Sequence, residues 1–168
     1  MTAEQLKSLQ APLKEKYKAE PASALVTLRA TGRATEGLSC KVETGKALVE
    51  AGLHPATGGD GTLACSGDML LEALVACAGV TLRAVATAIG ADLHDATITA
   101  EGDLDFRGTL GVSRDAPVGF KDVRLRFDFE GRLTEQERTT LLRLTERFCV
   151  VLQTLRTPPT IAVEATRA

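Results

Sequence analysis

The sequence predicts an α+β domain in which two long apolar helices pack against a curved antiparallel sheet. Two observations lead to this fold class. Two long segments carry apolar residues on the faces of a helix, and the segments between them alternate apolar and polar residues, as half-buried strands do. The chain has 168 residues, which is enough to bury one core without disulfides or metal ions. It contains no internal repeat and no linker, so a single domain with helices segregated from the sheet is expected.

The N-terminal residues 1–19 predict a short amphipathic helix. Thr2 and Gln5 have the spacing of a capping box, and leucines recur near the helical period. Pro12 falls inside this pattern and should kink or shorten the helix. The segment lacks the apolar stretch of a secretory signal, so we expect a cytoplasmic protein with an N-terminal extension, residues 1–20, before a domain of residues 21–168.

Two short strands are expected next, in "ALVTLRATG" (24–32) and "GLSCKVETG" (37–45). Both segments are rich in β-branched residues and end at a glycine. The following "HPATGGDGTLAC" (54–65) predicts a glycine-rich loop. Its glycines do not match a phosphate-binding loop, because no lysine followed by serine or threonine comes after them.

The first long helix is predicted from Ser66 to Gly90. Ser66 is a candidate N-cap, Asp68 suits the positive end of the helix dipole, and Gly90 is a typical C-terminal stop. Alanine, leucine and valine cover nearly every face, which is typical of a buried central helix. Because Glu72 and Arg83 interrupt the apolar run, we do not expect this helix to span a membrane.

The remaining segments predict two strands, a second long helix and a closing strand. "DATITAEGDLDF" (95–106) and "FKDVRLRFDFEG" (120–131) alternate apolar and polar residues. Thr134 and Glu137 form a capping box that opens the second helix, which is predicted to run to about Thr157, before two prolines. "TIAVEAT" (160–166) is expected to be the last strand.

Composition excludes several functional classes. The formal net charge is −2 and only 4% of residues are aromatic, so neither nucleic acid nor an anionic membrane surface is an expected partner. His54 and His94 lie far apart in the sequence and no Cys-x-x-Cys motif is present, so no metal site and no cofactor is predicted. Four cysteines in a chain of this size do not form a disulfide scaffold, and Cys40 and Cys65 are interpreted as structural or incidental.

The two long helices each carry one cysteine, Cys77 and Cys149, in apolar surroundings. The simpler interpretation is that both are buried core residues, since free cysteine behaves as a small hydrophobe. Two packed helices would also bring both thiols into one layer, where one could be oxidised to a sulfenic acid and the other could close a disulfide. Burial raises the pKa of a thiol, so a reactive Cys77 would need a cation nearby. Periodicity alone leaves both interpretations open.

Resemblance to a known family favours the second interpretation. "SGDMLLEALVAC" (66–77) resembles the "P-x-E-L-L-L-A-A-L-G-A-C" segment of the OsmC/Ohr family, the osmotically inducible protein C and organic hydroperoxide resistance proteins. "RFCVVLQTLRTPPTIAVEA" (147–165) is similar to the second cysteine helix and the closing strand of that family. The resemblance covers about Ala24 to Ala168. It implies an OsmC-like fold and an intertwined homodimer with each site at the subunit interface.

The resemblance also implies roles for particular residues. Cys77 would attack the O–O bond of an organic or lipid hydroperoxide, Cys149 would resolve the product, and an external dithiol of lipoyl or thioredoxin type would reduce the pair. "RATGRATEG" (29–37) resembles the strand-turn that supplies a thiolate-stabilising arginine, which makes Arg33 the candidate and Arg29 the alternate. Asp68 occupies the place of the family's glutamate. Nine residues of helix span about 13.5 Å, so Asp68 could orient Arg33 but not touch Cys77.

The chain departs from the family pattern at three places. Asp68 is shorter than glutamate, Gly67 stands where hydroperoxide-specific members have their glutamate, and Val150 stands where the peroxidases usually have proline. Arg33 and Asp68 have simpler interpretations as a solvated turn residue and a helix-dipole residue.

Two functions therefore remain open. The first is a thiol-dependent peroxidase whose apolar pocket favours organic hydroperoxides over hydrogen peroxide. The second is a non-catalytic dimer that binds a small hydrophobic molecule in the same pocket, with structural cysteines. A redox sensor would need disulfide formation without sustained turnover. The residues expected to line the pocket are Leu70, Leu71, Leu74 and Phe148.

Overall fold

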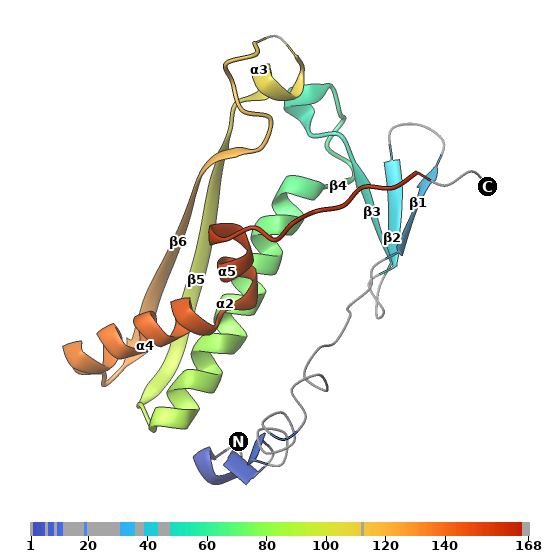
Figure 1. Cartoon of the computed structure of the whole chain (residues 1–168). Helices are drawn as coiled ribbons and strands as arrows, with labels where there is room; N and C mark the ends of the chain where they lie inside the picture. Colours follow the sequence, from blue (N-terminus) through green and yellow to red (C-terminus); the bar gives the residue numbers. More distant parts are fainter. Residues whose placement is uncertain are drawn as a thin grey trace.

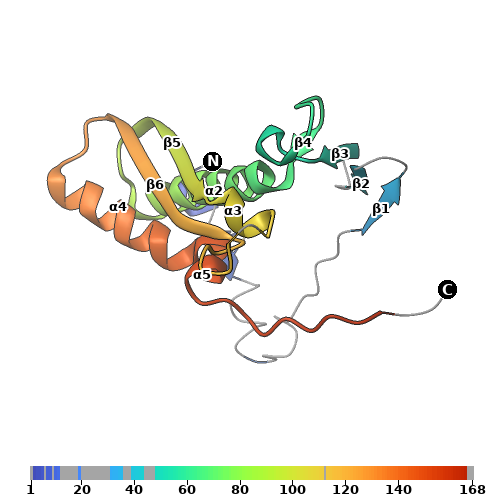
Figure 2. The same ribbon diagram turned by 90° about the horizontal axis from the view of Figure 1, so that it is seen from above.

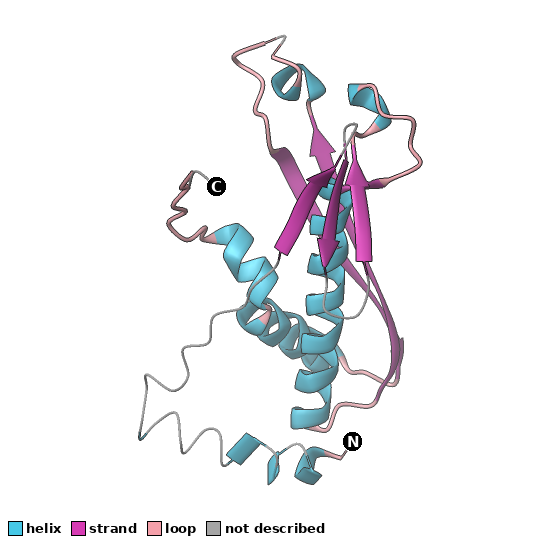
Figure 3. Cartoon of the chain, turned by 90° about the vertical axis from the view of Figure 1, so that its right-hand side faces the viewer, coloured by secondary structure: helices cyan, strands magenta, loops and turns pink. Residues whose placement is uncertain are grey.

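The computed structural model describes residues 49–111 and 113–165, the backbone of residues 31–35, 39–43 and 48, and positions 2–5, 7–8, 10–11 and 19. These residues form two sheets and a group of helices, and Figures 1 and 3 show the arrangement. The α+β class predicted from the sequence is confirmed. Near the N-terminus, Gln5 N–H donates to Thr2 Oγ1 at 3.1 Å and Thr2 N–H donates to Gln5 Oε1 at 2.9 Å, as the expected capping box requires.

The first sheet contains four short strands in the order β1-β2-β3-β4. The pairs β1–β2 and β2–β3 are antiparallel, whereas β3 and β4 are parallel. Their bounds are β1 Thr31–Thr35, β2 Ser39–Glu43, β3 Leu48–Gly52 and β4 Ala64–Cys65. The sequence predicts a strand near β1 and another at β2, but β3 was not anticipated. Residues 24–30 of the first expected strand lie outside the described residues.

The second sheet is a long antiparallel pair, β5 (Leu93–Leu104) and β6 (Phe120–Gly131). The short helix α3 (Phe106–Thr109) lies in the connection between the two strands. Alternation in β6 follows the sequence pattern, because Leu125, Phe127 and Phe129 are half-buried while the residues between them are exposed. The predicted closing strand is not formed, since residues 160–165 pair with no strand in the described part of the chain.

Helix α2 (Ser66–Ile89) is the centre of the core. Its N-cap is Cys65, one residue before the expected Ser66, and Gly90 ends it in the left-handed conformation with φ of 70°. Figures 1 and 2 show α2 running along the β5–β6 pair, with α4 (Glu135–Phe148) and α5 (Val150–Arg156) beside it, and residue contacts agree. One core cluster joins α2 to β5 and α4 and contains Leu82, Val85, Ala86, Leu93, Leu133 and Leu141.

The expectation that α2 is buried on every side is only partly met. In the single chain its buried face carries Leu74, Ala78 and Leu82, whereas Val80 on another face is 73% exposed. By length and composition alone α2 could cross a membrane. Packing against β5 and α4 is the behaviour of a core helix, so this is weak evidence for a membrane span.

The predicted second helix is two helices, α4 (Glu135–Phe148) and α5 (Val150–Arg156), separated by Cys149. Cys149 has an extended backbone, with φ of −72° and ψ of 107°, and is both the C-cap of α4 and the N-cap of α5. Its N–H donates to the carbonyl of Thr145, and its own carbonyl accepts from Gln153 N–H, both at 2.9 Å. The prediction of one helix to about Thr157 is therefore wrong, because the chain straightens at the cysteine.

Candidate functional site

The structure brings Cys77 and Cys149 together between α2 and the junction of α4 and α5. Both are free thiols; Cys77 is half-buried and Cys149 is fully buried. Cys149 packs with Leu74 and Ala78 in a small core cluster, and Cys77 lies against that cluster. The Cys149 thiol is close enough to the Cys77 sulfur to act as a hydrogen-bond donor that lowers the pKa of Cys77. Two cysteines that are 72 positions apart in the sequence thus form one pair.

The surroundings of Cys77 favour its thiolate. Burial opposes a charge on this sulfur, but hydrogen bonds from the Val151 N–H, the Cys149 thiol and the Val150 N–H outweigh burial and lower the pKa of Cys77. The Thr81 hydroxyl adds a smaller effect in the same direction. Because a thiolate is the nucleophilic form of cysteine, Cys77 is the more reactive member of the pair.

Cys149 has the opposite character. Burial raises the pKa of its thiol and the neighbouring Cys77 sulfur raises it further, although the N–H groups of Leu152 and Val151 act in the opposite direction. Cys77 therefore loses its proton more readily than Cys149, and Cys149 is the member of the pair that keeps its proton. One sulfur is prepared to attack and the other to remain protonated, which is the division of roles that an attacking and a resolving cysteine need.

The hydrogen-bond donors to Cys77 exist because the helix breaks at Cys149. The N–H groups at the start of a helix have no partner within the helix, and here those of Val150 and Val151 meet the Cys77 sulfur. A proline at position 150 would have no N–H. Val150, which departs from the family's usual proline, therefore supplies a donor that the usual residue lacks.

The structure does not place the expected cation at this pair. Arg33 lies on β1 opposite Lys41 of β2, but its side chain is outside the described residues, and Arg29 is wholly outside them. Asp68 is exposed in the first turn of α2 and makes no ion pair with any residue that the structure describes. The roles of Arg33 and Asp68 stay predictions.

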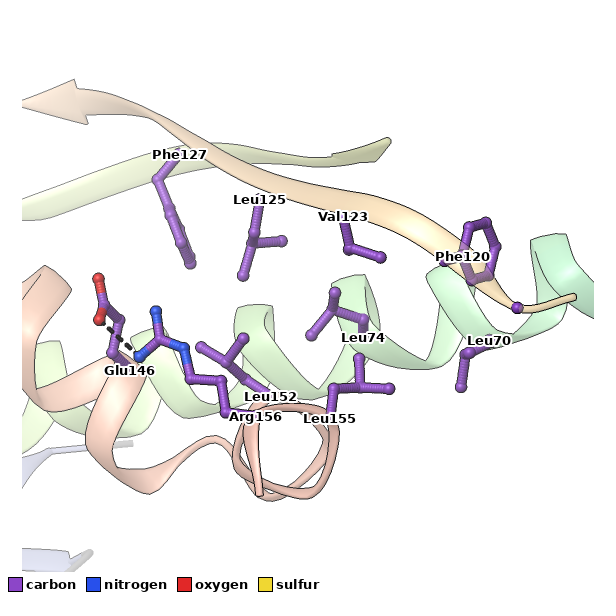
Figure 4. A pocket seen from close by; sticks show the side chains of 11 residues that line it. Leu70, Leu74, Phe120, Val123, Leu125, Phe127, Glu146, Leu152, Leu155 and Arg156 are labelled. Atoms are coloured by element: carbon purple, nitrogen blue, oxygen red, sulfur yellow. Dashed lines mark hydrogen bonds and ion pairs between the residues drawn. The ribbon is translucent and has the colours of Figure 1, made fainter. Parts of the chain in front are cut away.

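A cavity of about 550 Å³ lies beside the cysteine pair, between β6, α2 and α5 (Figure 4). Its walls include Leu74, Leu125, Phe127 and Leu152, and all four also belong to or pack against the cluster that holds Cys149. The rest of the lining is Leu70, Gly119, Phe120, Val123, Glu146, Leu155 and Arg156. The cavity is therefore apolar for most of its length. Neither cysteine lines it, but its walls pack against the cluster that contains Cys149 and that Cys77 contacts.

One end of the cavity is polar. Arg156 of α5 donates to Glu146 of α4 at 3.0 Å, and Figure 4 shows this ion pair facing the cavity near Phe127. Both side chains are about half exposed, so the pair lies where the cavity meets solvent. A long apolar molecule with a polar end group fits a site of this composition.

The expected pocket residues divide between two faces of α2. Leu70 and Leu74 line the cavity, one helical turn apart. Leu71 lines a separate depression with Asp68 on another face of α2, and Phe148 is 56% exposed and is not among the residues around the cavity.

Sequence reasoning did not assign the β6 and α5 side of the cavity. The signals were present, since Val123, Leu125 and Phe127 alternate along β6, and Leu152 and Leu155 are three residues apart on α5. Nothing in these patterns shows which apolar faces leave a space between them. Among the described residues, no group of three or more His, Cys, Asp or Glu side chains is placed to hold a metal ion.

Comparisons with known proteins identify a family. The family model described as OsmC-like protein matches residues 59–164, which include both cysteines and most of the cavity lining. None of the curated proteins matches the chain significantly.

Solved structures agree with the family match at the level of the fold. An OsmC-like protein from Mycoplasma pneumoniae superposes with a TM-score of 0.67 at 16% identity, covering 79% of this chain and 89% of that one. An organic hydroperoxide resistance protein OsmC from Legionella pneumophila gives 0.63 at 22% identity, covering 79% and 91%. An organic hydroperoxide resistance protein from Elizabethkingia anophelis gives 0.64 at 19% identity, covering 80% and 91%. At these identities the likeness shows a shared fold.

Proposed function

The chain belongs to the OsmC-like protein family, and from that premise we propose that it is a thiol-dependent peroxidase that reduces organic hydroperoxides. The observation that carries the proposal is the cysteine pair. Cys77 is half-buried and has a lowered pKa, Cys149 has a raised pKa and acts as a hydrogen-bond donor to Cys77, and an apolar cavity lies next to the cluster that contains Cys149. Solved neighbours named as organic hydroperoxide resistance proteins support the same reaction.

The reaction proceeds in two steps at the pair. The Cys77 thiolate attacks one peroxide oxygen, the O–O bond breaks, and the alkoxide leaves as an alcohol after taking a proton, which leaves a sulfenic acid on Cys77. The Cys149 sulfur then attacks the Cys77 sulfur, a disulfide forms, and the hydroxyl group leaves with the Cys149 proton as water. An external dithiol supplies the two electrons that restore both thiols.

The cavity gives the proposed enzyme its preference for organic substrates. Moving an alkyl chain from water to this apolar lining contributes about 0.8 kcal/mol per CH₂. Hydrogen peroxide gains nothing from this contact. The polar end at Glu146 and Arg156 allows a substrate whose far end remains hydrated.

The proposed enzyme is a cytoplasmic homodimer. Val80 and the small residues Ala73 and Ala76 leave an apolar stripe of α2 exposed in the single chain, which is the kind of surface that a second subunit covers. Arg33 of an early strand and Asp68 remain the proposed thiolate-stabilising cation and its orienting partner.

Non-catalytic binding of a hydrophobic molecule is the second candidate. One observation favours it: no cation lies at Cys77 in the described part of the chain. The apolar cavity could bind a ligand without a thiolate. The two functions differ in whether Cys77 consumes peroxide.

A single-turnover oxidation distinguishes the two functions. Reduced protein receives one equivalent of cumene hydroperoxide, or of hydrogen peroxide in parallel, and thiols are mapped by mass spectrometry. We expect a rapid Cys77–Cys149 disulfide with the organic peroxide, and a trapped sulfenic acid at Cys77 in Cys149→Ser. Cys65→Ser, which alters a thiol outside the pair, should react as the unmodified chain does. Intact thiols and unconsumed peroxide would favour the binding function.

A further inference from the structure

Thr145 carries a buried hydroxyl that has no hydrogen-bond partner among the residues that the structure describes. It lies in the last turn of α4, is fully buried, and its Oγ1 makes no hydrogen bond with any described residue. Threonines inside a helix usually donate to the carbonyl four residues earlier. Thr81 and Thr87 in α2 do so, to Cys77 and Arg83, both at 2.8 Å. Thr145 does not make this bond, so no hydrogen bond offsets the free-energy cost of removing its hydroxyl from water.

The position of Thr145 connects it to Cys149. The two residues are four apart, and the Cys149 N–H donates to the Thr145 carbonyl at 2.9 Å, so Cys149 still occupies the next helical position. Side chains at this spacing share one helix face, with Cβ atoms about 5–6 Å apart. Leu141, Thr145 and Cys149 follow one another on this face, and all three are fully buried. At this spacing, rotation about the Thr145 Cα–Cβ bond is the motion that would turn the hydroxyl toward the sulfur.

The chemistry of the pair creates a need for such a donor. Cys77 is half-buried and Cys149 is fully buried, so an external dithiol reaches the disulfide at Cys77. When the attacking thiolate forms a bond to the Cys77 sulfur, the S–S bond breaks and Cys149 departs with the electron pair, as a thiolate in an apolar cluster. The N–H groups of Leu152 and Val151 act on this leaving sulfur, but burial outweighs them and keeps the pKa of Cys149 raised, so a further donor would stabilise its thiolate.

We propose that the Thr145 hydroxyl donates a hydrogen bond to the Cys149 sulfur whenever that sulfur carries negative charge. This occurs as Cys149 attacks the oxidised Cys77 and again as it leaves during reduction of the disulfide. The proposal rests on the proposed function for the first of these steps and on thiol–disulfide exchange alone for the second. Thr145 contacts a reacting atom on this assignment and is a catalytic residue of the pair.

The test measures the second step without peroxide. In a Cys40→Ser, Cys65→Ser background, diamide oxidises the pair to its disulfide, and the rate of its reduction by dithiothreitol is followed by thiol release. Thr145→Val keeps the shape of the side chain and removes the hydroxyl, whereas Thr145→Ser keeps the hydroxyl. We expect reduction to slow about tenfold in Thr145→Val, the value of one charge-assisted hydrogen bond, and to stay near the parental rate in Thr145→Ser.

A structural role for the hydroxyl gives a different result. Urea unfolding of the reduced protein should show Thr145→Val to be as stable as the parent or more so, because the variant removes an unpaired buried group. Alkylation of Cys77 in the reduced protein should not change. Equal reduction rates for Thr145→Val and Thr145→Ser, or a slower rate that accompanies lost stability, would overturn the proposal.

The result also separates this inference from the proposed function. If diamide forms the disulfide and organic peroxide does not, the peroxidase proposal fails while the role of Thr145 is still measured by the reduction rate. If diamide forms no disulfide between Cys77 and Cys149, the sulfur of Cys149 takes no part in exchange and the assignment of Thr145 is wrong.

Discussion

At the scale of single residues, Cys77 and Cys149 combine the two interpretations that the sequence left open. Cys149 is a fully buried core residue and also bonds to a second thiol whose pKa is lowered. The sequence argument required a cation beside a reactive Cys77. Among the described residues, backbone N–H groups and a thiol stabilise the Cys77 thiolate in place of a side-chain cation. Sequence patterns could not predict this, because they do not show where unpaired backbone groups point.

The Cys149 thiol is expected to set part of the acidity of Cys77. In the unmodified chain, Cys77 should react with iodoacetamide at lower pH than an ordinary thiol with a pKa of 9.0, because hydrogen bonds to its thiolate lower its pKa. Cys149→Ala removes one donor and should move the reactivity profile to higher pH. Cys149→Ser retains a hydroxyl donor and is the matched control. An unchanged profile in Cys149→Ala would show that the thiol contributes nothing.

At the scale of secondary structure, the break between α4 and α5 decides the geometry of the site. The sequence predicts one helix here because apolar residues continue at helical spacing past Cys149, and no glycine or proline interrupts them. The extended backbone at Cys149 ends α4 and begins α5, which exposes the N–H groups of Val150 and Val151 to Cys77. Tertiary packing on α2 overrides the local pattern at this point.

Proline at position 150 offers a clean test of that geometry. Val150 is the first residue of α5, where proline is favoured, and Cys149 already has the extended backbone that a residue before proline adopts. Val150→Pro should therefore change the free energy of unfolding by no more than about 1 kcal/mol. It removes one N–H donor, so the pKa of Cys77 should rise and its alkylation profile should move to higher pH.

Val150→Ala is the matched control for this substitution. It shortens an exposed side chain and keeps the N–H group, so the alkylation profile should not move. A profile that is the same in Val150→Pro and Val150→Ala would mean that the N–H of residue 150 does not bond to the thiolate. Loss of stability in Val150→Pro would point instead to a changed helix break.

At the scale of the whole molecule, the exposed stripe on α2 is the feature that a single chain does not explain. The sequence predicts that α2 is apolar all round and buried. In the structure β5, α4 and α5 cover one side of the helix, and Ala73, Ala76 and Val80 remain uncovered. A homodimer would bury this stripe and reconcile the composition of α2 with its exposure.

The substitution Val80→Glu is expected to weaken that dimer. Val80 is 73% exposed in the single chain, so a charge there should not disturb the subunit core, but it would be buried without a partner in the proposed interface. Sedimentation velocity at several concentrations should show a dimer for the parent and a shift to monomer for Val80→Glu. Val118→Glu, at a loop residue that is 67% exposed, is the control and should remain dimeric. A parent that sediments as a monomer would contradict the dimer.

The fold could be predicted in outline and the site only in part. The capping box of Thr134 and Glu137, the helix end at Gly90 and the alternation along β6 follow local rules, and the structure confirms them, whereas the N-cap of α2 is Cys65 and not Ser66. The pairing of Cys77 with Cys149 followed from resemblance and from their places in two packed helices. Patterns along the chain did not predict the break at Cys149, the cavity wall from β6, or the unpaired hydroxyl of Thr145. All three depend on how elements distant in the sequence meet.

The shortness of α5 has a consequence for the dynamics of the site. Seven residues are too few for a helix to be stable alone, so α5 depends on contacts with α2 and on partners for its first N–H groups. One such partner is the negative charge on Cys77, which disappears when that sulfur is protonated or joined to another. Local unfolding of α5 is therefore linked to whether the Cys77 sulfur carries a negative charge. Hydrogen exchange at the amides of α5 would report the chemistry of Cys77 from the backbone, without any label on the thiol.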